Sequence, residues 1–308
     1  MKLDLTRIRL EGWKRTAAYA LFFLLAFAWA LHATFPTEAV KERLILEAAA
    51  QGWQVRLNDI SPHGLLGVRA REVTLQTRDG SRIPVDEVRG ALRPLAFLTG
   101  RRAVSFDAAL FDGKASGVSE RGRSVQRFQL KASGIDLGKA GALRKATGLD
   151  LAGILSADVD VTLDDKEPAR NAGTIELGVK DAAVRGGEIA IPGMASGLTV
   201  PPMTLGNVAI HGAVKGPRAD FDKVEAKGAD VEVIGEQAFL QLQPKVENSP
   251  LAGRARVRFA EAFWKQGQAA SLRPVVDAAL ATARLKDGGF GFQIYGTMGK
   301  PQARPMAF

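Results

Sequence analysis

The sequence predicts a mainly β protein: a large, twisted, mostly antiparallel sheet, either curled or β-sandwich-like, with a few short helices and a single N-terminal transmembrane helix. Many segments alternate apolar and polar residues with a period of two, the pattern of a strand with one apolar and one wet face. Glycine is abundant, at 33 of 308 residues against roughly 7% in average proteins, as expected of short strands joined by tight turns. Residues 16–35 contain no charged side chain.

The composition excludes several classes of protein. With 46% hydrophobic and 24% charged residues, the chain is not of the disordered class. It has no cysteine, so it has no disulfide, thiolate nucleophile or cysteine-ligated zinc site. The net charge is +9, but the basic residues beyond the N-terminus are spread along the chain. We therefore expect a mixed-charge surface and no nucleic-acid partner, with mild attraction to an anionic membrane surface as a further option.

The first 35 residues predict a basic cytoplasmic tail (residues 1–15) and a transmembrane helix (residues 16–35). About 20 residues at 1.5 Å rise are needed to cross roughly 30 Å of hydrocarbon, and this segment just reaches that length. Because the basic cluster comes first, the N-terminus should stay in the cytoplasm while the rest of the chain crosses. The predicted anchor residues are Tyr19, Leu21, Phe22, Phe23, Leu24, Leu25, Phe27, Trp29 and Leu31. The basic residues that set the topology are Lys2, Arg7, Arg9, Lys14 and Arg15.

Two alternatives to an uncleaved anchor remain open for this segment. Ala28-Trp29-Ala30 fits the small-x-small pattern of a signal-peptide cleavage site. The large residues that follow it and the length of the apolar run favour the anchor. The other alternative is a buried helix of a cytoplasmic protein. The anchor and the signal peptide both place the bulk of the chain outside the cytoplasm.

A second helix is expected in a membrane-proximal region at residues 36–52. Pro36 ends the first helix, and the Thr37 hydroxyl can cap the next one. We expect this helix to reach Gln51 and to end at Gly52. Its apolar stripe would lie on the membrane or cover one end of the sheet. The stripe consists of Val40, Leu44, Ile45 and Ala48.

Residues 53–308 form the predicted periplasmic β-rich domain, with a possible joint near residues 191–202. Alternation along each strand places its apolar residues on one face of the sheet. The pattern cannot distinguish a core sealed by a second layer from an open lipid groove, because both need the same alternation. The candidate apolar sheet face consists of Val73, Leu75, Phe128, Leu130, Val159, Val161, Ile175, Leu177, Val257, Phe259, Phe292 and Ile294.

Helices are expected to be few in this domain. Residues 137–147 and 274–285 are predicted helices, and residues 94–98 a single helical turn. Most gaps between strands are too short for the helices of parallel βαβ units, which favours antiparallel pairing. Asp112-Gly113 predicts a turn between two strands.

No residue pattern indicates catalysis, a cofactor or a bound metal. None of the three histidines, His32, His63 and His211, has a partner at metal-ligand spacing. An acidic stretch at residues 158–165 places carboxylates on the wet side of a strand and at its turn, so a surface role is favoured over a calcium site. The glycine clusters match neither a phosphate loop nor a dinucleotide fingerprint. We therefore predict that the chain is not an enzyme and carries no cofactor.

The order of segments and several short motifs resemble known envelope proteins. The basic tail and apolar segment are followed by residues 35–37 (Phe-Pro-Thr), 52–55 (Gly-Trp-Gln-Val) and 92–100 (Leu-Arg-Pro-Leu-Ala-Phe-Leu-Thr-Gly). Near the end, residues 295–301 read Tyr-Gly-Thr-Met-Gly-Lys-Pro, the most specific of these motifs. The layout, over essentially the whole chain, resembles the N component of type II secretion systems (GspN) and, more loosely, the AsmA-like envelope proteins.

The resemblance to GspN implies a single-pass inner-membrane protein of a Gram-negative bacterium, without enzymatic activity and with most of its chain in the periplasm. It would scaffold or contact other type II secretion components during export of folded proteins, and self-association is a further option. The AsmA-like resemblance implies an alternative, a lipid-binding or lipid-transfer protein that holds membrane lipids in an apolar groove of its curled sheet. The secretion role is favoured at this point because the terminal segments match that family better.

Overall fold

The protein is one large antiparallel sheet. The computed structural model describes residues 22, 23, 26, 36–50, 54–64, 66–76, 82–98, 100–189, 198–243 and 245–308. Strands make up 61% of the structure, which confirms the predicted mainly β class. Sixteen strands form a single sheet in the order β1-β3-β4-β5-β6-β7-β8-β9-β11-β12-β13-β14-β15-β16, while β2 also pairs with β3 and β10 with β9.

Most neighbours in the sheet are also neighbours in the chain, so the sheet is built as a meander. The strands are β1 (Gln54–Arg56), β2 (Asp59–His63), β3 (Gly67–Gln76), β4 (Arg82–Leu92), β5 (Arg102–Leu110), β6 (Gly113–Arg121), β7 (Val125–Asp136), β8 (Leu149–Asp164), β9 (Ala172–Ile189), β10 (Leu198–Val200), β11 (Met203–Lys215), β12 (Arg218–Lys227), β13 (Val231–Gln241), β14 (Leu251–Phe259), β15 (Phe290–Thr297) and β16 (Lys300–Pro305). Short connections of this kind give antiparallel pairs, as predicted.

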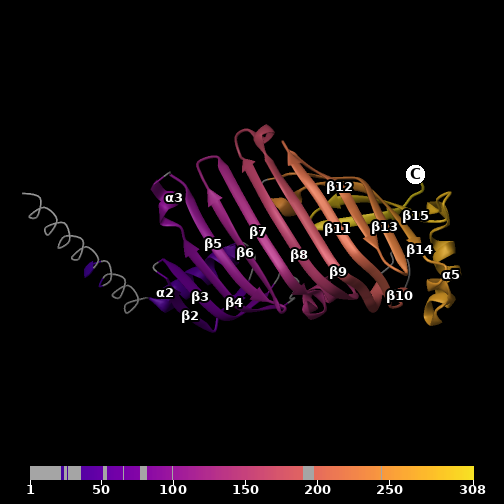
Figure 1. Ribbon diagram of the computed structural model, residues 1–308, viewed down its shortest axis with the longest axis horizontal. Helices are drawn as coiled ribbons and strands as arrows, with labels where there is room; N and C mark the ends of the chain where they lie inside the picture. Colours follow the sequence, from indigo (N-terminus) through magenta and orange to yellow (C-terminus); the bar gives the residue numbers. More distant parts are fainter. Residues whose placement is uncertain are drawn as a thin grey trace, which may run out of the picture.

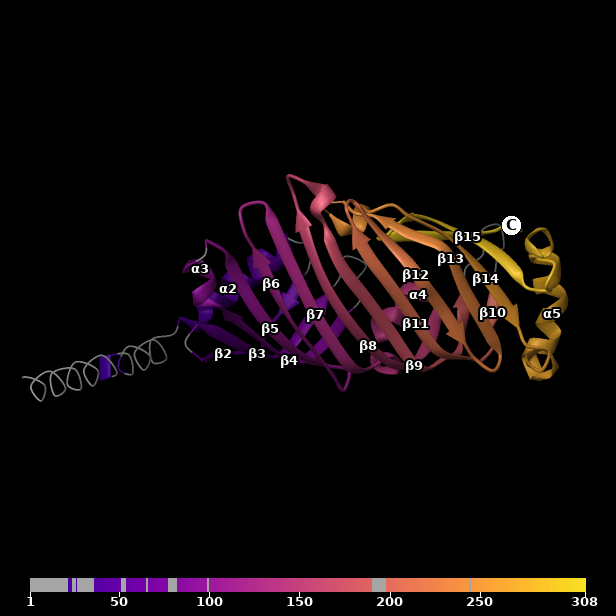
Figure 2. The same cartoon turned by 45° about the horizontal axis from the view of Figure 1, so that its top comes forward.

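The strands lie side by side in one curved layer, with α2 (Thr37–Ala50) and α3 (Pro94–Leu98) at one end and α5 (Gly267–Ala279) at the other (Figures 1 and 2). The curl is strong. Helix α4 (Gly141–Thr147) connects β7 to β8 and also contacts β4. In the order of the sheet β4 is four strands from β8, so only a strongly curled sheet allows this contact. The β-sandwich alternative is wrong, because the described residues form no second sheet.

The β5–β6 hairpin turns where the sequence predicted. Leu110 pairs with Gly113 across the turn. The two residues between them, Phe111 and Asp112, both have positive φ, at 49° and 62°. This is the backbone of the tight turns whose twist matches that of the flanking strands.

Two predicted helices differ from the observed ones. Residues 137–147 form a 3-10 turn, η1 (Leu137–Lys139), followed by α4. The prediction of a helix starting at Pro274 is wrong, because α5 begins at Gly267 and Pro274 lies inside it. Ala269, in the part of α5 that precedes Pro274, is buried against the aromatic pair Phe263 and Trp264. Tertiary packing, rather than the preference of proline for a first turn, therefore sets where this helix begins.

The predictions for the N-terminus are largely beyond the described part of the chain. The helix-ending residues Gln51 and Gly52, the topology-setting basic residues and all anchor residues except Phe22 and Phe23 lie outside it, as do residues 191–197 of the predicted joint. Within the described residues, no helix combines the length and apolar character required to span a bilayer.

Buried apolar side chains form three separate clusters in the described part of the chain rather than one core. The first joins Leu57, Ala70, Val73 and Val85 at the N-terminal end, where Ile45 of α2 packs on it. Of the predicted stripe, Ile45 therefore packs on the end of the sheet, whereas Leu44 is 39% exposed. The second cluster contains Val214, Ala219 and Leu240, and the third contains Phe263, Trp264 and Ala269 under α5.

Candidate functional site

One face of the sheet carries uninterrupted rows of apolar residues. Directly opposed residues of antiparallel strands point to the same side of a sheet. A first row crosses ten strands from β3 to β13 without a polar side chain, which at about 4.8 Å per strand spacing is about 43 Å. It consists of Val68, Gly90, Phe106, Gly117, Leu130, Val159, Ile175, Gly212, Phe221 and Ala238.

Two further rows flank the first on the same face. The second is also wholly apolar and crosses nine strands through Ala70, Val88, Ala108, Ala115, Ala132, Ala157, Leu177, Ile210 and Val224. The third, whose only polar member is Ser119, consists of Leu92, Val104, Ser119, Phe128, Val161, Gly173, Val214, Ala219, Leu240 and Leu251. We call these three rows the apolar face.

The middle of the apolar face remains open to solvent. Phe128 is 41% exposed and Val104 is 40% exposed, and Leu130, Ile175 and Leu177 are only half-buried. No second sheet in the described part of the chain packs on these side chains. Apolar surface of this extent is rare on a soluble protein unless it binds another apolar body.

Glycines keep the apolar face shallow. A Cβ atom at Gly117 would lie 2.5 Å from the ring of Phe106, and one at Gly212 would lie 2.7 Å from the ring of Phe221. The phenylalanine rings therefore lie across neighbouring glycines instead of standing away from the sheet. The high glycine content thus contributes to the shape of this face as well as to turns.

The opposite face, which we call the charged face, carries polar rows one residue out of step with the apolar ones. One such row consists of Arg69, Arg89, Asp107, Ser116, Lys131, Asp158, Glu176, His211 and Lys223. Several charges of the charged face are paired across strands. Lys131 Nζ lies 3.1 Å from Asp158 Oδ2, and the Arg127 guanidinium donates two hydrogen bonds, of 3.1 and 2.8 Å, to Asp160.

These pairs stabilise the ionised carboxylates. The hydrogen bonds from Arg127 and then from Gln129 hold the pKa of Asp160 below its ordinary value. His211 Nδ1 lies 2.5 Å from Asp222 Oδ1, and this hydrogen bond lowers the pKa of Asp222. His211 therefore has a hydrogen-bond partner at the surface, and none of the described residues forms a cluster able to hold a metal ion.

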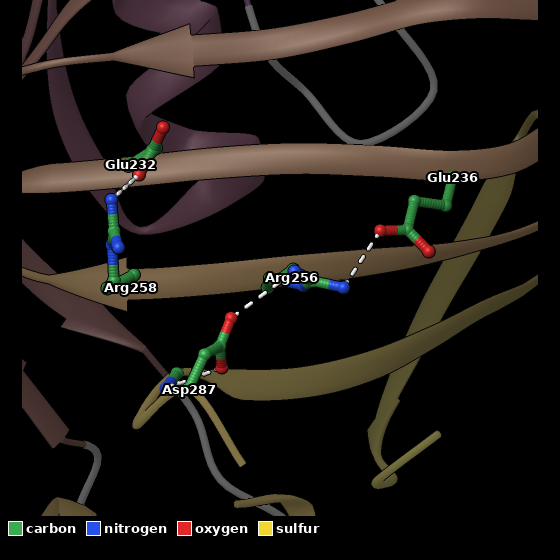
Figure 3. A network of polar contacts seen from close by, with 6 residues as sticks. Glu232, Glu236, Arg256, Arg258 and Asp287 are labelled. Atoms are coloured by element: carbon green, nitrogen blue, oxygen red, sulfur yellow. Dashed lines mark hydrogen bonds and ion pairs between the residues drawn. The ribbon is translucent and has the colours of Figure 1, made fainter. Parts of the chain in front are cut away.

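A second network of the charged face lies on β13, β14 and the segment before β15 (Figure 3). Arg256 lies between two carboxylates, with N–O distances of 3.1 Å to Glu236 and 3.2 Å to Asp287. Arg258 pairs with Glu232 on the neighbouring strand. Each of these cations has an anion of the protein itself as its partner, so the network leaves no evident vacancy for a charged ligand.

The acidic stretch 158–165 has structural roles. Asp158 and Asp160 lie on the charged face, as predicted, but Asp164 is buried rather than at the surface. Its carboxylate accepts hydrogen bonds from the backbone N–H groups of Lys166, at 2.9 Å, and Glu167, at 3.1 Å. It therefore closes the turn after β8, and these bonds lower the pKa of the carboxyl group.

The C-terminal end of the sheet holds a partly open apolar pocket of about 410 Å³, which we call the terminal pocket. Its wall is wholly apolar and comes from β10, β11, β13, β14 and β15 on one side and from η4 (Phe263–Lys265) and α5 on the other. Phe259 and Trp264, with ring centroids 5.0 Å apart, form its aromatic corner. The volume lies in the range of about 300–1,000 Å³ typical of small-molecule sites.

The predicted apolar residues come together on this side of the sheet. Phe128, Leu130, Val159, Val161, Ile175 and Leu177 belong to the three rows, whereas Val257, Phe259 and Phe292 border the terminal pocket. Ile294 lies two residues from Phe292 on β15 and so shares its side. Val73 and Leu75 pack in the N-terminal cluster with Ala70 of the second row.

The sequence reading missed the α5 side of the terminal pocket. The signal was present in the adjacent aromatics Phe263 and Trp264, followed by apolar residues at helical spacing at positions 272, 275, 276 and 279. The chain matches no known protein family, no curated protein and no solved structure.

Proposed function

We propose that this chain is a non-enzymatic protein of the bacterial envelope that binds the acyl chains of membrane lipids on its apolar face. The observation that carries this proposal is the set of three apolar rows that cross nine or ten strands and stay partly exposed in the middle. A row of about 43 Å exceeds the roughly 30 Å thickness of a bilayer's hydrocarbon core, so several acyl chains can lie along the sheet.

The chemistry of the two faces supports lipid rather than a polar ligand. The first two rows of the apolar face offer neither a hydrogen-bonding side chain nor a charge, so specificity for a sugar, nucleotide or peptide has no basis there. The gain from covering half-exposed side chains is about 25 cal/mol per Å² of apolar surface removed from water. Acyl chains provide such cover without a polar group that would be left unpaired.

The terminal pocket provides an end point for one of these chains. It lies on the same side of the sheet as the apolar rows, because Val257 and Val233 are directly opposed and Val233 is opposed to Ala226. Its wholly apolar wall suits the methyl end of an acyl chain. The headgroup would then remain in the open middle of the sheet.

Photo-crosslinking of the full chain in bacterial membranes tests this proposal. A photoreactive residue at Leu177, on the apolar face, should yield covalent phospholipid adducts by mass spectrometry. The same residue at Glu176, the preceding position on β9 and on the charged face, should yield few. Equal lipid adducts at both positions, or none at Leu177, would contradict the proposal.

A second candidate function is the predicted scaffold role in type II secretion, with the chain anchored in the inner membrane and most of it in the periplasm. The observation in its favour is the exposed terminal strand β16, because residues 295–301, the motif that resembles GspN, span the end of β15 and the start of β16. All six residues of β16 are exposed, as expected of a surface available to a partner protein. Co-purification of secretion subunits that is lost when β16 is changed, without loss of lipid adducts at Leu177, would favour this role.

A further inference from the structure

Arginines gather at one end of the strands around α3, and the sequence alone did not reveal this group. The chain passes this edge at the β4–β5 connection and again at the β6–β7 turn. The backbone N–H of Arg93 donates to Ala103 O, which brings the two sides of the β4–β5 connection together. We call this group the arginine rim; it consists of Arg93, Arg101, Arg102, Arg121 and Arg123, all of them exposed.

The arginine rim differs from the charged face because its charges are not balanced. Arg101 lies 3.9 Å from Glu120, a long and exposed contact. Among the described residues, no carboxylate lies within ion-pair distance of the other four arginines, whereas the charged face is paired throughout the network of Figure 3. Arg102 and Arg121 are directly opposed in the β5–β6 register. Like charges in that position destabilise a strand pair, and a bound anion would relieve the repulsion.

Exposed apolar side chains accompany these arginines. Leu95 of α3 is 76% exposed, and Leu92, which is 47% exposed, is directly opposed to Val104 at the end of the third apolar row. Arg102 precedes Val104 by two residues, so both lie on the same side of β5. This edge of the apolar face is therefore bordered by guanidinium groups, and the exposed Leu95 lies beside them.

We infer that the arginine rim and α3 dock onto the surface of a bilayer that contains anionic phospholipids. Guanidinium groups bind lipid phosphates, and the negative potential of such a surface attracts basic residues close to it. Leu92 and Leu95 match the apolar layer just beneath the headgroups. An acidic soluble protein would satisfy the charges but not the exposed leucines. Helices α2 and α3 both lie at the end of the sheet where the chain enters it (Figure 1).

Docking of this kind would bring the open apolar face to the membrane surface at the point where lipids enter or leave. The inference does not depend on lipid binding by the apolar face, because the arginine rim can bind a bilayer whether or not acyl chains occupy the sheet. Each proposal therefore has its own readout.

A fluorescent reporter at Leu95 tests the docking. The chain has no native cysteine, so Leu95→Cys gives a single site for a polarity-sensitive dye in the full-length protein. The protein is reconstituted in nanodiscs of phosphatidylcholine alone or with phosphatidylglycerol. The emission should shift to the blue only with phosphatidylglycerol, and the shift should shrink at high salt. A dye at Gln302 of β16, near the other end of the sheet, should not respond.

Two double variants with the same change of net charge identify the residues responsible. R102E/R121E should abolish the blue shift, whereas R144E/K145E on α4, at the opposite ends of the strands, should retain it. R102A/R121A should lose the shift without a fall in melting temperature, because the substitution removes a like-charge pair. Equal emission in both lipid compositions, or a shift that survives R102E/R121E, would overturn the inference. Lipid adducts at Leu177 should persist in R102E/R121E, which separates the two proposals.

Discussion

The two faces of this sheet are built from the same strands but satisfy their side chains differently. On the charged face, Lys131 and Asp158 form an ion pair across strands, so each charge already has a partner within the protein. On the apolar face, Leu130 and Val159 are opposed in the neighbouring register position and remain half-buried. Polar side chains can satisfy one another within a single layer, but apolar side chains need a second layer. This difference is why we propose the apolar face, and not the charged face, as the binding face.

The apolar face itself differs between its middle and its C-terminal end. At the end, η4 and α5 cover the sheet and bury Phe263 and Trp264. In the middle, Phe128 remains 41% exposed. The first region adds buried apolar contacts that stabilise the fold, and the second leaves exposed the apolar surface on which we propose that lipids bind.

The largest expected effect is on stability at the covered end. Trp264→Ala should lower the free energy of unfolding by about 3–5 kcal/mol, because it removes a buried indole from the aromatic cluster with Phe259 and Phe263. Phe128→Ala, in the open middle, should cost clearly less, since its ring is already partly in water. Urea unfolding followed by circular dichroism measures both. Similar losses for the two variants would mean that the middle is packed as tightly as the end.

A charge placed on the apolar face should impair binding more than folding. Leu177→Lys is expected to weaken phospholipid capture by about tenfold, equivalent to about 1.4 kcal/mol. Thr174→Lys adds the same charge to β9 on the charged face, opposite Asp160, and should leave capture unchanged. Labelled phospholipid retained by the purified full chain is the readout. Equal weakening by both substitutions would show that net charge, rather than the face, matters.

The ion pairs of the charged face predict acid sensitivity. The pKa values of Asp160, Asp222 and Glu225 are all held below their ordinary values of 3.8, 3.8 and 4.5 by hydrogen bonds from Arg127, His211 and Lys227. A carboxyl group with a lowered folded-state pKa stabilises the fold above its ordinary pKa, and this stabilisation is lost as the pH falls below it. The melting temperature should therefore fall between about pH 5 and pH 3.

The variant Arg127→Ala checks the origin of this acid sensitivity. Without the guanidinium, Asp160 should titrate nearer its ordinary pKa. The variant should be less stable at neutral pH and should lose less on acidification than the parent chain. An unchanged pH profile would exclude the Arg127–Asp160 pair as a contributor.

The smallest expected effect is the removal of one exposed cross-strand pair. Lys131→Ala should cost about 0.2–1 kcal/mol, because both partners are largely exposed. A double-mutant cycle with Asp158→Ala isolates the pair energy. A coupling energy above that range would mean that the charged face contributes more to the fold than surface ion pairs usually do.

The sequence alone determined the sheet and the sides of its strands. Alternation at residues such as Phe128, Leu130, Ile175 and Leu177 fixes which side chains share a face, because successive residues of a strand point to opposite sides. The short turn at Asp112-Gly113 followed from local preference in the same way. Both are properties of a few neighbouring residues.

Only the tertiary structure decided what covers the apolar face. A period-two pattern is identical for a sealed core and an open groove, so the choice between sandwich and single sheet depended on packing between residues far apart in the chain. For the same reason, the start of α5, the terminal pocket and the opposition of Arg102 to Arg121 were not predicted. Each arises from segments brought together by strand register and by the curl of the sheet, which no local pattern specifies.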